Sequence, residues 1–399
     1  MQIYLERKLK ELNFVNITPI QKKVFTSFEQ PLHLVGISPT GTGKTHAYLL
    51  PILSKIAWQR NIIQAVIIAP TNELVFQIFQ MLKGIEKQNS KVKIFYGGMD
   101  QKKITSHLKT KQPPVVIATL NQLVKYTITN KQLNIYKASF LVLDEADMLF
   151  DSKSLSLINL LLIRWHPKIL LFSASITTHM KPFVDKYFGK SLFLNTNKEQ
   201  RLKIKYYALH SFCYKRLNDL VHLAKKLNPY AALIFVSNKK NQFHVYETLK
   251  KENLNVLNFS SDLLVKQRKR YISEIHKNKY QYIVSSDLTA RGLDLDISWV
   301  IHYDLPIKNL EFFQHRSGRT GRLGKEGNVL VLYDEKEKTY LEKIKKLYQI
   351  TFQNIELTPN GYKTKISKSN IFFKKNVHNY KLQNCLPNKK KLFKRRVKK

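Results

Sequence analysis

Three carboxylates stand at the end of a short apolar segment, at Asp144, Glu145 and Asp147. The segment before them, residues 140–143, reads Phe-Leu-Val-Leu, which is typical of a strand buried on both faces of a parallel sheet. Ligands of such sheets bind beyond the carboxyl ends of the strands, so Asp144 and Glu145 are expected at the working edge of the sheet. The alternative is a solvated acidic turn that binds nothing.

A glycine-rich loop lies upstream, where residues 38–45 read Ser-Pro-Thr-Gly-Thr-Gly-Lys-Thr. An apolar segment precedes this loop and helix-forming residues follow it, so the predicted order is strand, loop and helix. Backbone N–H groups of such a loop wrap phosphates, while Lys44 reaches the β and γ phosphates and the Thr45 hydroxyl ligates Mg²⁺. The strict pattern has Gly at the position of Ser38. The predicted phosphate-binding residues are Thr40, Gly41, Thr42, Gly43, Lys44 and Thr45.

Asp144-Glu145-Ala146-Asp147 together with this loop resembles the DEAD-box RNA helicases. The resemblance implies an α/β fold of two tandem RecA-like domains, each a parallel sheet flanked by helices, with ATP and Mg²⁺ bound between them. It implies that Thr45 and Asp144 hold Mg²⁺, partly through water, and that Glu145 orients and activates the attacking water. It also implies that Gln21 reads adenine, with Phe14 beside the base.

Predicted strands alternate with predicted helices along both halves of the chain, which favours two parallel sheets. Residues 195–201 are polar and suit a linker between them. Past Glu356 the chain has no acidic residue, and Lys and Arg alternate there with aromatic residues, which suits RNA binding. A disordered solubilising tail is the alternative. The expected organisation is a first domain at 1–194, a linker at 195–204, a second domain at 205–356 and a basic tail at 357–399.

The second half carries arginines at intervals of three, at Arg316, Arg319 and Arg322, interrupted by glycines. An arginine presented across a cleft can stabilise charge on a transferring phosphoryl group, and the alternative is a solvated basic helix end. The resemblance assigns that role to Arg319 and Arg322. It places Gly292 and Asp294 at the nucleotide, with Asp294 at the ribose. It assigns coupling between the domains to Asp147, Ser173, Ser175, His315 and Arg316.

Strand ends in both halves match the RNA-backbone segments of the family. The residues implied are Pro70, Thr71, Gly98, Thr119, Arg268 and Ser286. Arg268 can also be read as an ordinary surface residue. The family has arginines where this chain has Asn72 and Gln122, so the first domain is expected to hold RNA more weakly than its relatives do.

The composition fits this prediction. The 399 residues suit two domains, and 68 Lys and Arg against 28 Asp and Glu give a formal charge of +40, which indicates a polyanionic partner. A Lys-rich genomic bias is the alternative source of this charge. Cys213 and Cys385 lack the spacing of a zinc site or a disulfide framework. No apolar run is long enough to span a membrane and the first residues lack a signal-peptide core, so we expect a cytoplasmic protein without a membrane partner.

We therefore expect an ATP-dependent RNA helicase that clamps and locally unwinds or remodels RNA duplexes, acting as a monomer in ribosome assembly or RNA turnover and in cold adaptation. Several stretches are similar to the cold-shock DEAD-box helicases of low-GC Gram-positive bacteria, and ribosomal particles or RNA-decay proteins are the expected further partners. One alternative is an RNA-binding chaperone or assembly factor with weak ATPase, which Asn72, Gln122 and the basic tail favour. Another is a DNA-directed motor of the same superfamily, against which the Gln21 segment stands.

Overall fold

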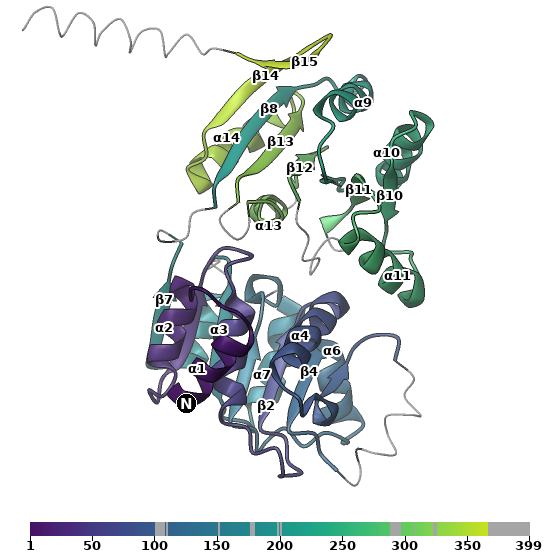
Figure 1. Cartoon of the computed structure of the whole chain (residues 1–399). Coiled ribbons are helices and arrows are strands. Elements are labelled where there is room, and N and C mark those ends of the chain that lie inside the picture. Colours follow the sequence, from purple (N-terminus) through teal and green to yellow (C-terminus); the bar gives the residue numbers. More distant parts are fainter. Residues whose placement is uncertain are drawn as a thin grey trace, which may run out of the picture.

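The structure is a computed structural model of the chain. It describes residues 1–99, 108, 111–150, 152–175, 180–197, 199, 202–287, 297–307, 309–321 and 325–365. Within these ranges, two sheets form two domains, the first below and the second above in Figure 1.

The sheet of the first domain is parallel throughout its described strands. Its strands, in spatial order, are β3 (Lys93–Phe95), β4 (Val115–Thr119), β2 (Ala65–Ala69), β5 (Phe140–Leu143), β6 (Lys168–Ser173), β1 (His33–Ile37) and β7 (Ser191–Asn195). Helices cover it: α1 (Gln2–Glu11), α2 (Pro19–Ser27), α3 (Lys44–Leu53), α4 (Asn72–Ile85), α6 (Leu120–Val124), α7 (Ser152–Leu162) and α8 (Lys181–Phe188).

The sheet of the second domain is parallel except for its last pair, β14 and β15, which is antiparallel. Its strands, in spatial order, are β10 (Val256–Phe259), β11 (Tyr282–Ser285), β9 (Ala232–Phe235), β12 (Trp299–His302), β13 (Gly327–Tyr333), β8 (Ile204–His210), β14 (Phe352–Thr358) and β15 (Gly361–Thr364). Its helices are α9 (Arg216–Leu227), α10 (Lys239–Lys251), α11 (Val265–His276), α13 (Glu311–Ser317) and α14 (Lys338–Tyr348).

Each sheet has a hydrophobic core on both faces. In β2, Val66 and Ile68 pack into one core while Ala65, Ile67 and Ala69 pack into the other, since successive side chains of a strand point to opposite faces. The central strands are therefore continuous apolar runs, as burial on both faces requires. This confirms the predicted α/β fold with two parallel sheets.

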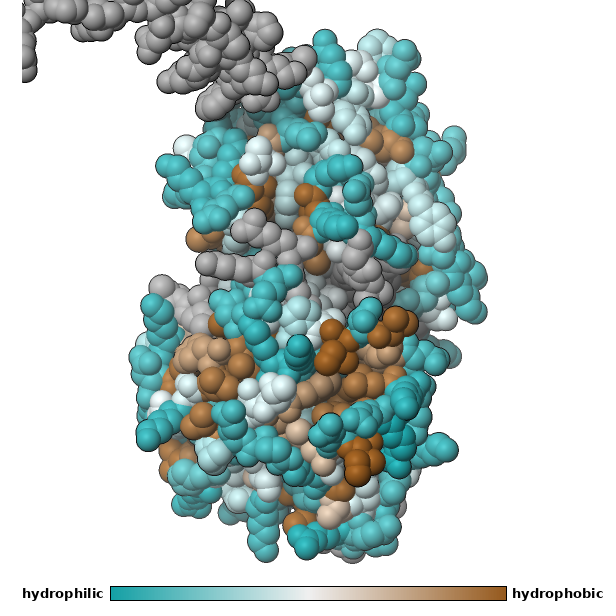
Figure 2. Space-filling model, turned by 60° about the vertical axis from the view of Figure 1, so that its left-hand side comes forward, coloured by the Kyte–Doolittle hydropathy of each residue, from teal (hydrophilic) through white to brown (hydrophobic). Residues whose placement is uncertain are grey.

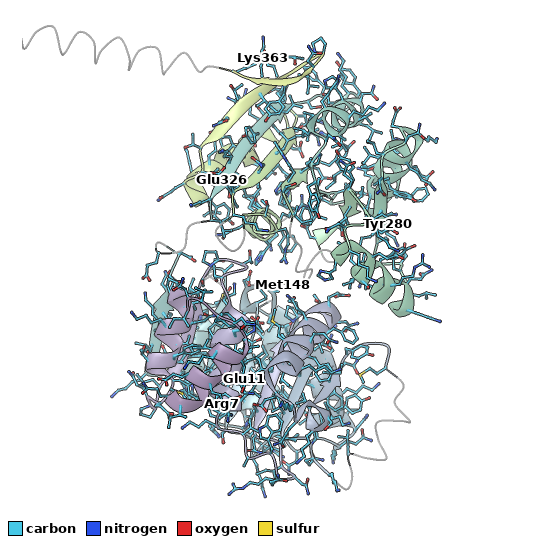
Figure 3. All side chains as sticks on the ribbon, in the orientation of Figure 1. Arg7, Glu11, Met148, Tyr280, Glu326 and Lys363 are labelled. Atoms are coloured by element: carbon cyan, nitrogen blue, oxygen red, sulfur yellow. The ribbon has the colours of Figure 1, made fainter. Side chains whose placement is uncertain are left out.

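The ends of several strands lie together at one edge of the first sheet. The turns after β1, β2, β4, β5 and β6 all follow the carboxyl ends of parallel neighbours, so they lie at one edge of the sheet. Met148, which follows Asp147 directly, lies on the side of this domain that faces the second one (Figure 3). Helix α13 lies on the facing side of the second domain (Figure 1).

The limits of the sheets differ slightly from the predicted organisation. Strand β7 ends at Asn195 and β8 begins at Ile204, so strands occupy both ends of the predicted linker. Strand β14 runs to Thr358 and pairs with β15, and these strands extend the second sheet past the predicted start of the tail at residue 357. The predicted site residues Gly292, Asp294 and Arg322, and the tail beyond residue 365, lie outside the described residues.

Hydrophilic side chains dominate the face shown in Figure 2, with hydrophobic residues gathered mainly on the first domain. Among the described residues, no helix combines the length and the apolar character that crossing a membrane requires.

Candidate active site

The acidic turn after β5 is built around one strained residue. Glu145 has φ 46° and ψ 53°, the left-handed region that costs non-glycine residues energy and is found at functional sites. Its backbone N–H donates a hydrogen bond of 3.0 Å to Asp144 Oδ1. One oxygen of its carboxylate, Oε2, is buried and has no hydrogen-bond partner among the described residues. An unpaired buried carboxylate oxygen is costly, so this atom is available to a ligand or a water.

The carboxylates of this turn have opposite pKa shifts. Burial and the neighbouring charge of Glu145 raise the pKa of Asp144 to about 7, although Lys44 opposes the shift. Burial alone would raise the pKa of Asp147, but the charge of His315 and hydrogen bonds from His315 and Ser173 lower it to about 2. Asp147 is therefore ionised, whereas a cation bound near Asp144 would lower its raised pKa and stabilise its ionised form.

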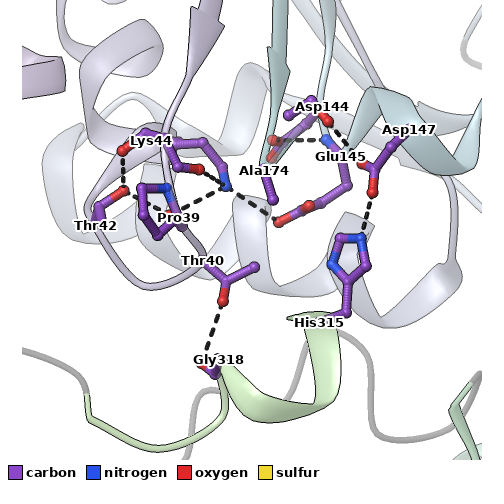
Figure 4. Close-up of polar contacts among 12 residues, drawn as sticks. Pro39, Thr40, Thr42, Lys44, Asp144, Glu145, Asp147, Ala174, His315 and Gly318 are labelled. Atoms are coloured by element: carbon purple, nitrogen blue, oxygen red, sulfur yellow. Dashed lines mark hydrogen bonds and ion pairs between the residues drawn. The ribbon is translucent and has the colours of Figure 1, made fainter. Parts of the chain in front are cut away.

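The glycine loop curls around its own lysine. Lys44, 5 % exposed, donates hydrogen bonds to the carbonyl oxygens of Ser38 at 2.9 Å and Pro39 at 3.3 Å. Its Nζ lies 3.8 Å from Glu145 Oε1 (Figure 4). The Ser38 and Thr42 hydroxyls lie 2.6 Å apart, so Ser38, where the strict pattern has Gly, forms part of the loop itself.

Two glycine positions of the loop have left-handed backbones. Gly41 has φ 78° and Gly43 has φ 86°. A Cβ on Gly43 would also stand 2.5 Å from Gln21 Nε2, so only glycine fits there. Helix α3 begins directly after it, at Lys44, and its N-terminus points into the loop as an anion-binding site requires.

Gln21 is fully buried against the loop. Its amide nitrogen donates to Gly43 O at 3.3 Å, and its amide oxygen accepts from the Thr18 N–H at 2.9 Å. The Phe14 ring contacts His46 of α3 edge-on, with ring centroids 5.2 Å apart. Both residues predicted to surround adenine thus lie beside the predicted phosphate loop.

Contacts from the end of α13 bring the second domain onto this edge. His315 of α13 makes a hydrogen-bonded ion pair with Asp147, whose other carboxylate oxygen accepts from the Ser173 hydroxyl at 2.9 Å. The Thr40 hydroxyl donates to Gly318 O at 3.2 Å (Figure 4). A Cβ on Gly318 would stand 1.9 Å from Thr40 Oγ1, so this close approach requires glycine.

The arginines after His315 have different surroundings. Arg316 is 1 % exposed and forms a bidentate pair with Asp287, at 2.5 and 2.8 Å, and hydrogen bonds to Ser237 Oγ and Asp304 O. Arg316 therefore holds strand ends of the second domain together. Arg319 lies directly after Gly318 and is 8 % exposed.

The predicted RNA residues end or follow strands in both domains, except for Arg268, which lies in α11. Thr71 caps α4, where its hydroxyl accepts from the Leu74 N–H at 3.3 Å, and Gly98 has φ 85°. Pro70 follows β2, Thr119 ends β4 and Ser286 follows β11, while Ser175, which was predicted to couple the domains, follows β6.

Sequence reasoning missed three contacts. Arg268 of α11 pairs with Glu73 of α4 across the two domains, and the Asn72 amide holds Gly97 through hydrogen bonds of 3.3 and 3.0 Å. The buried Tyr48 hydroxyl donates to Asp144 Oδ2 at 2.8 Å. Only Tyr48 carried a sequence signal, since it stands three residues after Thr45 on the same helix face.

The oxygens present suit Mg²⁺, which takes carboxylate, hydroxyl and water oxygens. Asp144 is a buried carboxylate whose pKa a cation would lower, and it lies near the unpaired Oε2 of Glu145. Glu145, Asp147 and His315 also bring ligand atoms within 4.8 Å of one another, but Asp147 and His315 already satisfy each other.

Both domains match known protein families. A DEAD/DEAH box helicase model matches residues 18–183, and a helicase conserved C-terminal domain model matches residues 213–324. The DEAD-box ATP-dependent RNA helicase CshB of Bacillus cereus is 34 % identical over 366 residues, which cover 89 % of this chain and 83 % of that protein. CshB of Bacillus subtilis is 33 % identical, over 88 % of this chain and 82 % of that protein.

Solved structures share the fold. Dbp5 of S. cerevisiae bound to RNA and ADP BeF3 has a TM-score of 0.79 at 23 % identity, covering 88 % of this chain and 93 % of that chain. The DEAD-box helicase Mss116 bound to ssRNA and UDP-BeF has a TM-score of 0.79 at 26 % identity, covering 89 % of this chain and 78 % of that chain. The family models, the bacterial relatives and the acidic turn beside a glycine loop agree, and the chain belongs to the DEAD-box ATP-dependent RNA helicases.

Proposed function

We propose that this protein hydrolyses ATP when RNA holds its two domains together, and that it uses this cycle to clamp and locally unwind or remodel RNA. Two contacts carry the proposal: His315 of α13 with Asp147, and Gly318, directly after α13, with Thr40. Through them the arginine segment of the second domain lies against the glycine loop of the first. The site is then composite, since phosphate-binding groups and arginines come from different domains.

The proposed chemistry rests on positioning and electrostatics. Lys44, now bonded to carbonyl oxygens of its own loop, exchanges them for phosphate oxygens. Glu145 takes the attacking water through its unpaired Oε2, and Arg319, with Arg322 beyond the described residues, stabilises the developing charge. Mg²⁺ held by Thr45 and, through water, Asp144 would neutralise charge on the phosphates.

The base and ribose contacts complete the proposed ATP site. Gln21 has a second amide hydrogen beyond the one given to Gly43, and we assign it to adenine, with Phe14 beside the ring. Gly292 and Asp294, beyond the described residues, are proposed at the nucleotide.

Arg268 supports the proposed RNA path. Its Nη1 donates a hydrogen bond to Glu73 Oε1, while Nε and Nη2 are buried and lack partners among the described residues. Buried donors without acceptors are costly, and a phosphate would satisfy both. Pro70, Thr71, Gly98, Thr119 and Ser286 are the further proposed backbone contacts.

The wider proposal covers partners and location. We expect RNA recognised by its backbone, ribosomal particles or RNA-decay proteins as further partners, and a monomer acting in the cytoplasm. Because the 2′-OH distinguishes RNA from DNA at a given site, RNA should stimulate ATP hydrolysis far more than a DNA strand of the same sequence. Equal stimulation by the two strands would reject an RNA-directed activity, and tight RNA binding without stimulation would favour an assembly factor with weak ATPase.

Arg268→Ala tests the RNA path, and Arg270→Ala on the same helix is the matched control. Arg270 is exposed and pairs with Glu274, so it has no unpaired buried donors to offer. Arg268→Ala should weaken ATP-dependent RNA binding by about tenfold and reduce the salt slope by about 0.7, whereas Arg270→Ala should change neither. Equal effects of the two substitutions would assign Arg268 to general surface charge.

A further inference from the structure

Tyr48 lies between the two residues proposed to hold Mg²⁺. It stands in α3, three residues after Thr45, and this spacing places the two side chains on one helix face. Its side chain is fully buried, with the ring tilted against Phe172 at 5.2 Å between centroids.

The Tyr48 hydroxyl faces both of these residues. It donates a hydrogen bond to Asp144 Oδ2 at 2.8 Å, and the Thr45 hydroxyl stands close enough to act toward it as a hydrogen-bond donor. Asp144 Oδ1 accepts from the backbone N–H of Glu145 at 3.0 Å, so both oxygens of this carboxylate are fixed. The Tyr48 hydroxyl therefore stands between the Thr45 hydroxyl and the Asp144 carboxylate.

We propose that Tyr48 is a positioning residue for the Mg²⁺·ATP site, because its hydroxyl orients Thr45 and Asp144 together. This inference rests on the proposed function. A hydroxyl has one proton and two lone pairs. When Thr45 gives its proton to Tyr48, its lone pairs are left for the cation, and the proton of Tyr48 in turn fixes the rotation of the Asp144 carboxylate.

A purely structural role for Tyr48 makes a different prediction. The ring belongs to the hydrophobic core of the first domain, and a phenylalanine ring would fill the same volume. Tyr48→Phe keeps that packing and removes only the hydroxyl. It leaves the Thr45 proton unassigned and the buried Oδ2 of Asp144 without its donor.

The matched control is Tyr126→Phe. Tyr126 is 1 % exposed in the same domain, and its hydroxyl has no hydrogen-bond partner within the described residues. The two variants therefore make the same chemical change at buried positions in the two cores of one domain, and only one removes a link between proposed Mg²⁺ ligands.

The test is the affinity of a non-hydrolysable ATP analogue for the full chain, measured with Mg²⁺ and with EDTA. The parent and Tyr126→Phe should bind it at least about tenfold more tightly with Mg²⁺, and Tyr48→Phe should lose about fivefold or more of that enhancement while its affinity in EDTA stays within about twofold of the parent's. In an Asp144→Asn background, Tyr48→Phe should add at most about twofold, because the two residues act as one unit.

The outcomes separate this inference from the proposed function. An undiminished Mg²⁺ enhancement in Tyr48→Phe overturns the positioning role, and so does a full additional loss in the Asp144→Asn background. If the parent itself shows no Mg²⁺ enhancement, the proposed Mg²⁺·ATP site is wrong and the inference falls with it. Circular dichroism melting of each variant confirms that the folded protein is being compared.

Discussion

Glu145 and Arg316 are both charged side chains at the domain edges that face each other, yet their surroundings are opposite. Arg316 is 1 % exposed, with its guanidinium bonded to Asp287, Ser237 and Asp304 and lying over the Phe235 ring. Glu145 has a left-handed backbone and one buried oxygen without a partner in the described structure.

This difference in hydrogen bonding distinguishes a residue with a structural role from one that can bind a ligand. A fully satisfied buried charge stabilises the fold and has nothing left to give a ligand, whereas a strained residue with an unpaired atom is stabilised by what binds there. Arg316 therefore holds the edge of the second domain together, and Glu145 is the residue that we propose acts on the substrate. Both residues lie in short motifs, and sequence similarity alone does not distinguish the structural role of one from the proposed catalytic role of the other.

Glu145→Gln should have the largest effect on activity. The substitution keeps the shape and removes the base that activates water, so RNA-stimulated ATP hydrolysis should fall by about 10³-fold, equivalent to about 4 kcal/mol. Binding of ATP and RNA should persist, and the complex should become long-lived. Hydrolysis within about threefold of the parent rate would remove Glu145 from the reaction.

Arg316→Ala should instead act on stability. It leaves Asp287 without its bidentate partner, and since Asp287 retains some exposure we expect a loss near the low end of the range for broken buried pairs, about 3 kcal/mol. Urea unfolding of the full chain measures this loss. A variant as stable as its parent but inactive would move Arg316 from the scaffold to the reaction.

Asp144→Asn should sharpen the comparison through its pH dependence. The pKa of Asp144 is raised to about 7, so the folded protein binds this proton more tightly than the unfolded chain does. Its contribution to stability is present at low pH and is lost as pH rises through about 7. Between about pH 5 and about pH 8, the variant should therefore gain about 2 kcal/mol relative to the nucleotide-free parent. A pH-independent difference would contradict the raised pKa.

Asn72→Arg and Gln122→Arg form the pair with the smallest expected effects. Both restore a family arginine, but Asn72 already holds Gly97 through two hydrogen bonds, whereas Gln122 makes no side-chain hydrogen bond recorded within the described residues. Gln122→Arg should tighten RNA binding by about fivefold, while Asn72→Arg should change it by less than about twofold because the lost bonds offset the new contact. Equal gains at both positions would mean that the hydrogen bonds between Asn72 and Gly97 do not contribute to RNA binding.

The central strands and the glycine loop could be predicted because their signals are local. Strand β5 appears at the limits predicted from residues 140–143, since a short apolar run is typical of burial on both faces, and the loop before Lys44 needs glycines at fixed positions. Strands β7, β8, β14 and β15 were not predicted. In β14 the two adjacent exposed residues Gln353 and Asn354 break the alternation expected of a half-buried strand, and the segment is a strand because it pairs with β8 and β15.

The site contacts that sequence reasoning missed are long-range. Arg268 meets Glu73 only when the two domains come together, and Tyr48 meets Asp144 only when α3 packs on the first sheet. Spacing within one segment places Tyr48 on the helix face of Thr45, but it encodes neither of these pairings. The family resemblance supplied His315 and Asp147 as coupling residues, but not the hydrogen bond that makes them one unit. Motifs predicted which residues belong to the site, but not which hydrogen-bond partner each of their polar atoms has.

The most direct test of the account is the coupling between ATP and RNA binding in the parent and in His315→Ala. If contacts from α13 assemble a composite site, a non-hydrolysable ATP analogue should tighten RNA binding by about tenfold or more, and RNA should tighten the analogue by the same factor. Removing the His315 contact to Asp147 should reduce both factors to below about threefold while each ligand alone binds as before. Undiminished reciprocal coupling in His315→Ala would contradict the claim that this contact joins the two domains into one site.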